Sequence, residues 1–490
     1  MLSRKKKEVP QPLSEDVRDA LPEQAQEYLE KLEEELKKAK EEIEDLKGQL
    51  QMRSHNSSKP PSSDGLAKRP VIPGSQRTRS GRKPGGQPGH PGSTLLPVSR
   101  PDRTEHHSVA RCGCGCDLSK VTASRLEISQ SFDLPKTPIE ITEHRREVKI
   151  CPSCRSKTTA PLPAGLQGAA AEYGPRLKSY ALYLLNEHLL PARRVCGILK
   201  DFFGVGFSSG SLMRWEAQAF RGLEAFEKDL KEALIGSKVV NFDETGMRCQ
   251  GRLHWLHSAS TSQLTFFGIH AERGTQAMRD FAILPAFRGI AVHDHWKSYF
   301  QFEDCLHSLC NAHILRELKF LEEEFKERWA GRMSELLLDI RDRVGHARAL
   351  GKSLLSRTVR RNFLRKYEKI LRSGFRFHVA HDPVFQPGAR GRTKQTKGKN
   401  LLDRLRDFKT EVLRFMNEFQ APFTNNQGEQ DIRMNKVKQK ISGCFRSVAY
   451  ATSFCRIRSY LSTMRKQGAG ALDALHAALI GAPLLIAQPP

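Results

Sequence analysis

The 490-residue sequence contains no apolar run close to the roughly 18 residues that a membrane-spanning helix requires. The longest apolar run, residues 477–487, is interrupted by Pro483. The first residues include a basic cluster, but no apolar segment follows it as it would in a secretory signal. We therefore expect a soluble, intracellular protein without a membrane partner.

Acidic residues are scarce relative to basic ones. Lys and Arg number 80 against 55 Asp and Glu, which gives a formal charge of +25 and a pI near 9.7. An excess of this size favours a polyanionic partner, most often nucleic acid. The net charge is about −4 in residues 1–50, and about +8, +12 and +7 in residues 53–100, 351–400 and 421–470. We expect the polyanion-binding surfaces to follow the acidic N-terminal segment.

Cysteine is sparse, and 11 is an odd number, so thiols or metal ligands are a better interpretation than disulfides. Five cysteines gather within residues 112–154, where C-x-x-C places two thiolates across one turn, as in half of a tetrahedral zinc site. The other half, C-G-C-G-C, is irregular, and His106 or His107 could substitute. Incidental thiols are the alternative; a redox pair is disfavoured because no thioredoxin-like βαβ pattern surrounds it. We predict structural Zn²⁺ in residues 101–165, bound by Cys112, Cys114, Cys151 and Cys154, with Cys116 as a substitute.

A heptad pattern occupies residues 21–52. Its apolar positions follow a 3, 4, 3, 4 spacing that predicts a coiled coil and a homo-oligomer formed through residues 25–50; they are Leu29, Leu32, Leu36, Ala39, Ile43, Leu46 and Leu50. An amphipathic helix packed on its own domain is the alternative. Residues 53–100 are rich in Ser, Pro, Gly and basic residues, which predicts a disordered linker or a DNA-contacting arm.

Residues 170–232 have a helical pattern with a glycine break. One helix is expected from Gly174 to Glu187 and a second after Pro191, and Ser208 or Ser209 can cap a third beyond Gly204. A helix, a glycine turn and a capped helix are typical of a helix-turn-helix DNA-binding domain. Helical hairpins of this kind are also common packing units, so both interpretations are open.

After residue 238 the pattern changes to short β-branched or aromatic runs separated by turns, which predicts a buried sheet. Two of these strands end in a carboxylate, Asp243 and Asp294, and Glu429 opens a later helix. Three converging carboxylates repel one another unless cations neutralise them, and hard oxygen ligands suit Mg²⁺. Two such ions could support an in-line phosphoryl transfer.

Each carboxylate also has a purely structural interpretation. Asn426-x-x-Glu429 matches a capping box, Asp243 could shape a turn, and Asp294 could be a surface residue at a strand end. The 135 positions between Asp294 and Glu429 are too many for a loop, so they must contain a folded helical insertion. Three cations share the helical face of Glu429 and suit a site that holds phosphates: Arg433, Lys436 and Lys440.

The sequence resembles the insertion-sequence 66 family of bacterial transposases from about Leu21 to its C-terminus. The motifs that carry this resemblance are NSSKPPSSDG, GRKPGGQPGHPG, YGPRLKSYALYLLNEHLLPARR, NFDETG, VHDHWKSY, CNAHILREL, NLLDRLRDF, FTNNQGEQDIRMNKVKQKISGCFRS and RIRSYLSTMRKQG. The resemblance implies a DDE transposase that uses Mg²⁺ or Mn²⁺ to cleave DNA at terminal inverted repeats and to join the ends to target DNA. It implies Asp243, Asp294 and Glu429 as the catalytic, metal-binding triad.

The implied architecture is a multidomain α/β protein with a ribonuclease H-like catalytic core. That core comprises residues 236–312 and 421–466, with the helical insertion at 313–420 and a C-terminal tail at 467–490. A bacterial, cytoplasmic, nucleoid-associated protein is expected, with accessory proteins of the same element as further partners.

Two departures from the family pattern affect particular residues. The first cysteine cluster lacks the usual C-x-x-C, and Gln430 replaces an Arg, which removes one phosphate contact. His313 and Arg316 in CNAHILREL share a helical face and could position DNA, although a packed, hydrogen-bonded His is the commoner explanation. The competing hypotheses are a non-catalytic, sequence-specific DNA-binding regulator and a folded but inactive transposase.

Overall fold

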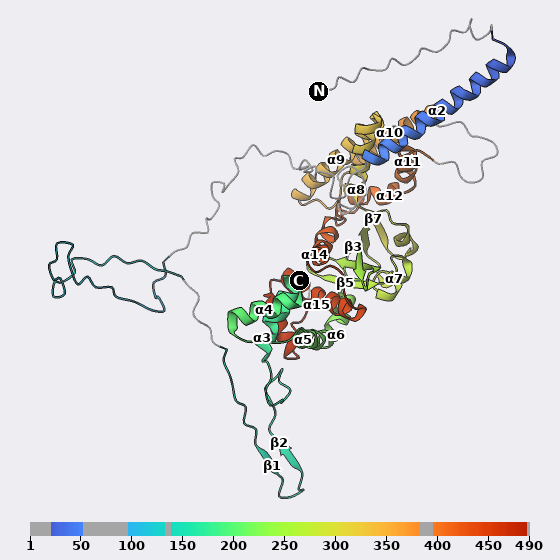
Figure 1. The fold of residues 1–490 in the computed structure, drawn as a ribbon. Coiled ribbons are helices and arrows are strands. Elements are labelled where there is room, and N and C mark those ends of the chain that lie inside the picture. The colour runs from blue at the N-terminus through green and yellow to red at the C-terminus, as the bar shows by residue number, and fades with distance from the viewer. Residues whose placement is uncertain (1–20, 52–96, 133–138, 382–394, 488–490) are drawn as a thin grey trace.

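The computed structural model describes residues 21–51, 97–132, 139–381 and 395–487 (Figure 1). It is a mixed α/β structure in which helices surround one five-stranded sheet, and the predicted fold class is confirmed at this level. Within the described ranges no helix has both the length and the hydrophobicity needed to cross a membrane. The predictions for residues 53–96 lie outside the described residues.

The central sheet has the strand order β5-β4-β3-β6-β7. The strands β3 (Val239–Cys249), β4 (Arg252–Ser260) and β5 (Thr265–His270) form an antiparallel meander. The remaining strands, β6 (Ile290–His293) and β7 (Leu306–Leu309), are parallel to β3. Strand β6 is buried at all four positions, as its unbroken apolar run IAV predicts for a central parallel strand.

Helices from the C-terminal part of the chain cover the sheet. Helix α14 (Asn426–Ser442) packs on β3 and β4, and α15 (Val448–Lys466) packs on β5. Polar bonds fix α15 to the β5 backbone: the Ser459 hydroxyl accepts from Phe267 N at 2.8 Å, and the Thr463 hydroxyl accepts from Thr265 N at 3.0 Å. The last helix, α16 (Ala471–Leu479), contacts α15 and the N-terminal helices.

The helices that directly precede the sheet in the sequence begin with α3 (Pro175–Leu182), which continues through a π-helical turn at Tyr183–Glu187. Helix α4 (Ala192–Phe203) starts after Pro191 and ends at Gly204, whose φ of 70° is left-handed. Ser208 caps α5 (Ser209–Gly222) by accepting from Ser211 N at 3.1 Å, so this predicted cap is confirmed. Helix α6 (Glu224–Ile235) leads into β3.

The sides of α5 are mostly covered, since it packs against α3, α4, α15 and α16 and buries Leu212, Trp215, Glu216 and Ala219. Its exposed positions include Gly210 and Arg214 in the first two turns, whereas α4 exposes Arg193, Arg194 and Lys200. The α4–α5 hairpin therefore packs into the fold, and exposed cations lie on both α4 and α5. Its DNA-binding role stays a prediction.

A helical region separates β7 from α14. It contains α8 (Asn311–Phe325), α9 (Arg328–Ala349), α10 (Arg357–His381), α11 (Lys397–Asp407), α12 (Lys409–Val412) and α13 (Arg414–Asn417). Its apolar core includes Trp329, Tyr367 and Phe415 and is continuous with Ile290, Val292 and Leu309 of the sheet. The insertion is therefore packed against the sheet rather than tethered to it.

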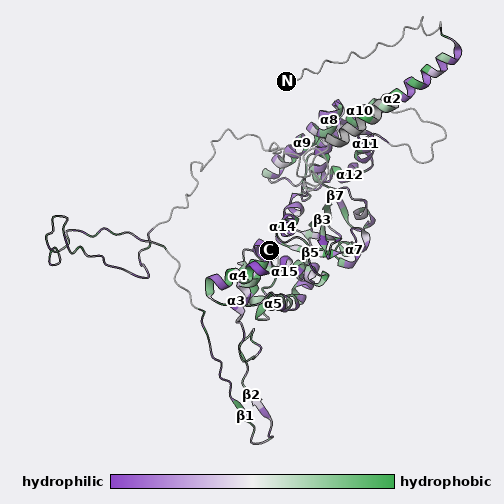
Figure 2. Ribbon diagram, in the orientation of Figure 1, coloured by the Kyte–Doolittle hydropathy of each residue, from purple (hydrophilic) through white to green (hydrophobic). Residues whose placement is uncertain are grey.

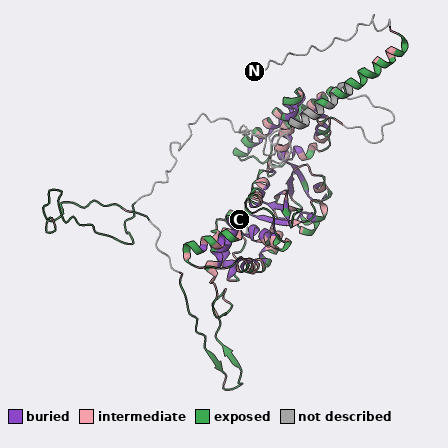
Figure 3. Ribbon diagram, viewed as in Figure 1, coloured by how far each residue is buried: buried purple, intermediate pink, exposed green. Residues whose placement is uncertain are grey.

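The N-terminal part of the described chain is much more exposed (Figure 3). Helix α2 (Glu23–Gln51) confirms the helical periodicity, and Figure 2 shows hydrophobic and hydrophilic residues alternating along its coloured part. Its heptad residues Leu32, Leu36 and Ile43 are 43%, 56% and 50% exposed. Strands β1 (Val148–Ile150) and β2 (Lys157–Thr159) form an isolated exposed hairpin (Figure 1).

Candidate functional site

Two of the predicted carboxylates lie at the same level of adjacent parallel strands. The last paired residues of β3 and β6 are Asn241 and Val292, and Asp243 and Asp294 stand two residues further along. Asp243 is not at a strand end as predicted, because β3 continues to Cys249 by pairing with β4 alone. It marks instead the point at which the parallel pairing stops, which opens an edge beside it.

Helix α14 carries the third carboxylate, and Asn425 fixes the position of this helix. The Asn425 side chain accepts a hydrogen bond from Asn241 Nδ2 and donates one to the Phe242 carbonyl, both at 2.8 Å. Its backbone N–H donates to Cys310 Sγ at 3.1 Å. Because Asn241 and Asp243 point to the same face of β3, this anchor places Glu429 over the face that carries Asp243.

The predicted capping box does not form. The N-cap of α14 is Asn425, which makes no side-chain capping bond, and Glu429 faces His313 and Arg316 on α8 instead. Glu429 Oε1 lies 3.8 Å from His313 Nδ1, and Oε2 lies 3.9 Å from an Arg316 Nη atom. Glu429 therefore does not act as a cap of α14, and the purely structural explanation of this residue is not supported.

The electrostatics of Asp243 show that the three carboxylates interact. Burial raises its pKa well above the usual range, and the negative charges of Glu244, Asp294 and Glu429 raise it further. In the metal-free protein this centre therefore disfavours the ionised form of Asp243. A divalent cation would reverse that preference, so the donor set of three carboxylates fits Mg²⁺ or Mn²⁺.

A fourth carboxylate, Glu244, is held by a separate network that the sequence did not indicate. Its side chain is 2% exposed and binds Arg273 Nε and Nη2 at 3.0 and 2.7 Å, and it accepts a hydrogen bond from the Tyr299 hydroxyl. The Arg273 guanidinium lies over the rings of Trp255 and Trp296, at 4.9 and 3.6 Å from their centroids. These partners favour ionised Glu244, although burial raises its pKa overall.

The network adjoins Asp294. Asp294 Oδ1 accepts the backbone N–H of Trp296 at 2.9 Å in a tight local turn, which orients the carboxylate and places the indole against Arg273. Glu244 follows Asp243 directly and Tyr299 belongs to the quoted VHDHWKSY motif, so those two residues could have been suspected from the sequence. Nothing in the sequence pattern pointed to Arg273.

A cavity of about 170 Å³ lies beside Asp294 and extends toward α8 and α11. It is lined by Asp294, His295, Trp296, Leu309, Cys310, His313, Ile314, Glu317 and Arg404. Of the three predicted carboxylates, Asp294 borders this hollow.

The predicted cations of α14 differ in their availability. Arg433 and Lys440 are exposed, whereas Lys436 is half-buried and donates to the Gly246 carbonyl of β3 at 2.8 Å. Burial lowers the pKa of Lys436. Asp431, beside the departure at Gln430, forms an ion pair with Lys466 at 2.8 Å. Arg433 and Lys440 are therefore better placed than Lys436 to contact a phosphate.

The predicted zinc ligands occupy two local turns. Cys112 N donates to Cys116 O at 2.9 Å in the first turn, and Arg155 N donates to Cys151 O at 2.9 Å in the second. A hydrogen bond from Ser156 lowers the pKa of Cys154 to about 7, which favours a thiolate. Among the described residues of this segment, however, no three ligand atoms are gathered as a metal would require. Zinc binding here stays a prediction.

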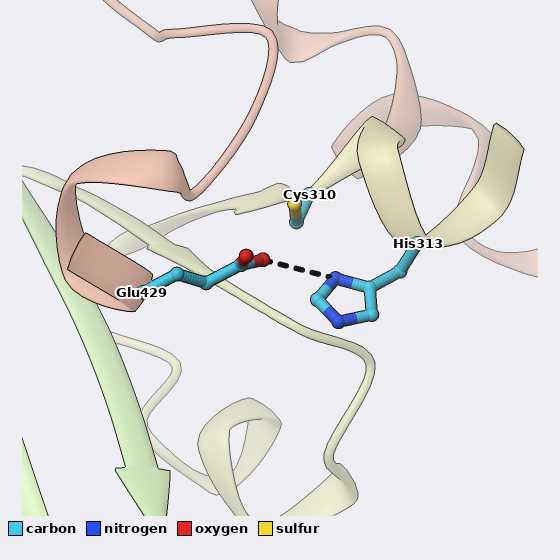
Figure 4. A group of neighbouring side chains, drawn as sticks. All are labelled: Cys310, His313 and Glu429. Carbon is cyan, nitrogen blue, oxygen red and sulfur yellow. Dashed lines mark ion pairs between the residues drawn. The ribbon is translucent and has the colours of Figure 1, made fainter. Parts of the chain in front are cut away.

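One ligand cluster that the sequence did not single out lies at the carboxylates. Cys310, His313 and Glu429 bring a thiol sulfur, a ring nitrogen and a carboxylate oxygen within 4.8 Å of one another (Figure 4). Burial raises the pKa of Cys310 to about 11, so its thiol is neutral without a metal. The pair Cys310 and His313 stands in the quoted CNAHILREL motif, which was the available signal.

Comparison with known families gives two matches. Residues 9–95 match a family of unknown function, DUF6444. No curated protein matches the chain. Residues 171–453, more than half of the chain, match the model of the transposase IS66 family, and this range contains the sheet, the insertion and all three carboxylates. The chain therefore belongs to the IS66 family of transposases.

Proposed function

We propose that this chain is a DDE transposase that binds terminal inverted repeats and catalyses metal-dependent DNA cleavage and strand transfer. The observation that carries the proposal is the electrostatic coupling of Asp243 to Asp294 and Glu429, which come from a neighbouring parallel strand and a distant helix. Their negative charges add to the effect of burial in raising the pKa of Asp243, and such a cost is relieved when a cation is bound. Family membership supplies the DNA chemistry that such a cation would serve.

The fold supports the proposal. A five-stranded sheet in which one antiparallel meander adjoins two parallel strands is consistent with a ribonuclease H-like core. On this proposal Asp243, Asp294 and Glu429 hold Mg²⁺ or Mn²⁺, which when bound would activate an attacking oxygen and stabilise the leaving one. Asn425 and the Glu244 network hold these carboxylates in place.

DNA contacts are assigned to the exposed cations. Arg433 and Lys440 are exposed on α14, the helix that carries Glu429, and are proposed to bind backbone phosphates. The exposed Arg193, Arg194 and Lys200 of α4 are proposed to contribute to end binding. Structural zinc in the cysteine segment, oligomerisation through α2, and accessory proteins belong to the same proposal.

The decisive experiment compares the wild type with Asp243→Asn on DNA that carries the ends of the element. The variant should bind this DNA with wild-type affinity but cleave it at below about one per cent of the wild-type rate in Mg²⁺, since one electrostatic group in an active site contributes on the order of a hundredfold or more. Asp304→Asn, which alters a 70% exposed carboxylate, is the matched control and should cleave normally.

Two results would contradict the proposal. Undiminished Mg²⁺-dependent cleavage by Asp243→Asn would show that Asp243 is not part of a catalytic triad. Specific binding without any nicked or joined product from the wild type, in either Mg²⁺ or Mn²⁺, would favour a DNA-binding regulator or an inactive transposase.

A further inference from the structure

The cluster of Cys310, His313 and Glu429 combines three kinds of ligand atom. Cys310 ends the β7 connection as the N-cap of α8, and His313 follows three residues later, so both face the same side of the first helical turn. Glu429 approaches from the first turn of α14 (Figure 4). The three ligand atoms lie within 4.8 Å of one another, and small side-chain rotations would bring them to the roughly 3–4 Å that ligands about 2.0–2.3 Å from one tetrahedral ion keep.

Two of these atoms lack the partners that buried polar atoms normally have. His313 Nδ1 and Glu429 Oε1 are both buried, neither has a hydrogen-bond partner, and they lie 3.8 Å apart, too far for a hydrogen bond. Leaving a buried polar atom unsatisfied costs about 1–3 kcal/mol. The arrangement is one in which a cation between the nitrogen and the oxygen would satisfy both atoms.

The third ligand, Cys310, is buried and has a hydrogen-bond donor directed at its sulfur. Cys310 is 2% exposed, and its sulfur accepts a hydrogen bond from the backbone N–H of Asn425 at 3.1 Å. Such a bond stabilises negative charge on sulfur, as it does for other anions that accept backbone N–H groups. The same Asn425 fixes α14 to β3, so one residue orients both the sulfur and the helix that carries Glu429.

The donor set decides the type of metal. Mg²⁺ takes oxygen ligands and water, whereas sulfur, imidazole and carboxylate together suit Zn²⁺ and similar transition metals. We propose that Cys310, His313 and Glu429 bind one Zn²⁺-type ion, with a fourth position open to water. Binding releases the thiol proton of Cys310 to solvent.

This site has a regulatory consequence, which rests on the proposed function. Glu429 cannot serve both ions fully, so Zn²⁺ at the cluster withdraws a carboxylate from the Mg²⁺ site. Zn²⁺ should therefore inhibit DNA cleavage in competition with Mg²⁺. Binding at the cluster requires no DNA and can be measured separately.

The binding test uses the full chain without DNA and titrates it with Co²⁺, whose bond to a thiolate gives a strong charge-transfer absorption. Cys310→Ser should bind one equivalent less of thiolate-ligated Co²⁺ than the wild type. Cys305→Ser is the matched control, because Cys305 is also buried and flanks the other end of β7 outside the cluster. The cysteines of residues 112–154 contribute equally to all three proteins.

A second variant guards against a folding defect. His313→Gln, checked by circular dichroism, should weaken Co²⁺ binding at this site at least tenfold while it retains the thiol. Equal stoichiometry and affinity in the wild type, Cys310→Ser and His313→Gln would overturn the proposed site.

The inhibition test compares the Zn²⁺ concentration that halves Mg²⁺-dependent cleavage, each protein being normalised to its own zinc-free rate. Cys310→Ser should need at least tenfold more Zn²⁺ than Cys305→Ser. Equal sensitivity in these two variants would overturn the inhibitory role. If no protein cleaves DNA, the proposed function fails, and the Co²⁺ titration still decides whether the metal site exists.

Discussion

The cysteine segment (residues 101–165) and the carboxylate centre (Asp243, Asp294 and Glu429) are both candidate metal sites, but they are built in opposite ways. The cysteines lie on local turns with exposed surroundings and few contacts to the rest of the chain. The carboxylates come from elements up to 186 positions apart, and these elements pack together without a metal, so the charges of Asp294 and Glu429 raise the pKa of Asp243. The first site would be assembled by its ion, whereas the second is held by the fold.

This difference predicts where substitutions will matter. A site assembled by its ion contributes to folding mainly when the metal is present. A site held by the fold stores unfavourable charge in the metal-free protein and depends on neighbouring side chains to tolerate it.

The largest effect is expected at Arg273. Arg273→Met leaves Glu244, which is 2% exposed, without its cation, and breaking such a pair should lower the free energy of unfolding by about 3 kcal/mol. This is the lower end of the usual range because Arg273 itself is 29% exposed. Urea denaturation measures the change.

The matched control is Arg125→Met in the cysteine segment. Arg125 pairs with Glu127, but the two side chains are 78% and 81% exposed, so the unfolding midpoint should not move. If both Met variants behave alike, the buried network around Glu244 does not support the carboxylate centre.

A smaller effect is expected at Asn425. Asn425→Ala removes two buried hydrogen bonds between α14 and β3 and should lower the free energy of unfolding by about 2–3 kcal/mol. It should also reduce cleavage, because Glu429 loses its anchor. The neighbouring Asn426 is exposed, so Asn426→Ala is the control and should change neither quantity appreciably. Equal loss in both variants would assign the effect to the helix start rather than to the anchor.

The contrast between Asn425 and Asn426 shows what the sequence can predict. The pattern N-x-x-E correctly located the beginning of α14, because capping signals are local. It favoured Asn426 and a capped Glu429, whereas the structure uses Asn425 as a link to β3. The identity of that partner depends on a strand 183 positions away, which no local pattern contains.

The sequence selected Asp243 and Asp294 from strand-end patterns, Glu429 from a helix start, and all three from the family resemblance, and their shared catalytic role stays a prediction. Asp243 was nevertheless assigned to a strand end, since the sequence does not show that β4 continues to pair beyond the parallel region. Arg273 was missed because its role comes from two tryptophans and a glutamate that meet only in the folded chain.

A third effect concerns the charge stored at the carboxylate centre. The folded-state pKa of Asp243 is raised above its usual value of 3.8, so ionisation destabilises the metal-free fold. This cost is absent at pH 3, where Asp243 is protonated in both states, and it grows as the pH rises above about 4. Asp243→Asn should therefore be more stable than the wild type at pH 7 without metal, by roughly 1 kcal/mol or about 1–2 °C in Tm.

Thermal unfolding at pH 3 and pH 7, with and without Mg²⁺, tests the sign of this effect. The stability difference should vanish at the lower pH, and Mg²⁺ should raise the Tm of the wild type more than that of Asp243→Asn. If Asp243→Asn is less stable than the wild type at pH 7 in chelator, ionised Asp243 does not destabilise the metal-free fold.

The smallest effect on the core is expected from the cysteine segment. If Zn²⁺ assembles this segment, it should protect residues 101–165 from proteolysis in the wild type and in Ser153→Ala, which keeps both thiols of the second turn. Cys154→Ser should lose that protection, because the thiolate favoured by Ser156 is removed.

The Tm of the core should nevertheless agree within about 1 °C between Ser153→Ala and Cys154→Ser at equal Zn²⁺, since the segment shares few contacts with the sheet. Zinc bound at Cys310 would be common to both variants and cancels in this comparison. A core Tm that falls with Cys154→Ser would mean that the cysteine segment docks on the catalytic region, and the division between a site assembled by its ion and one held by the fold would not hold.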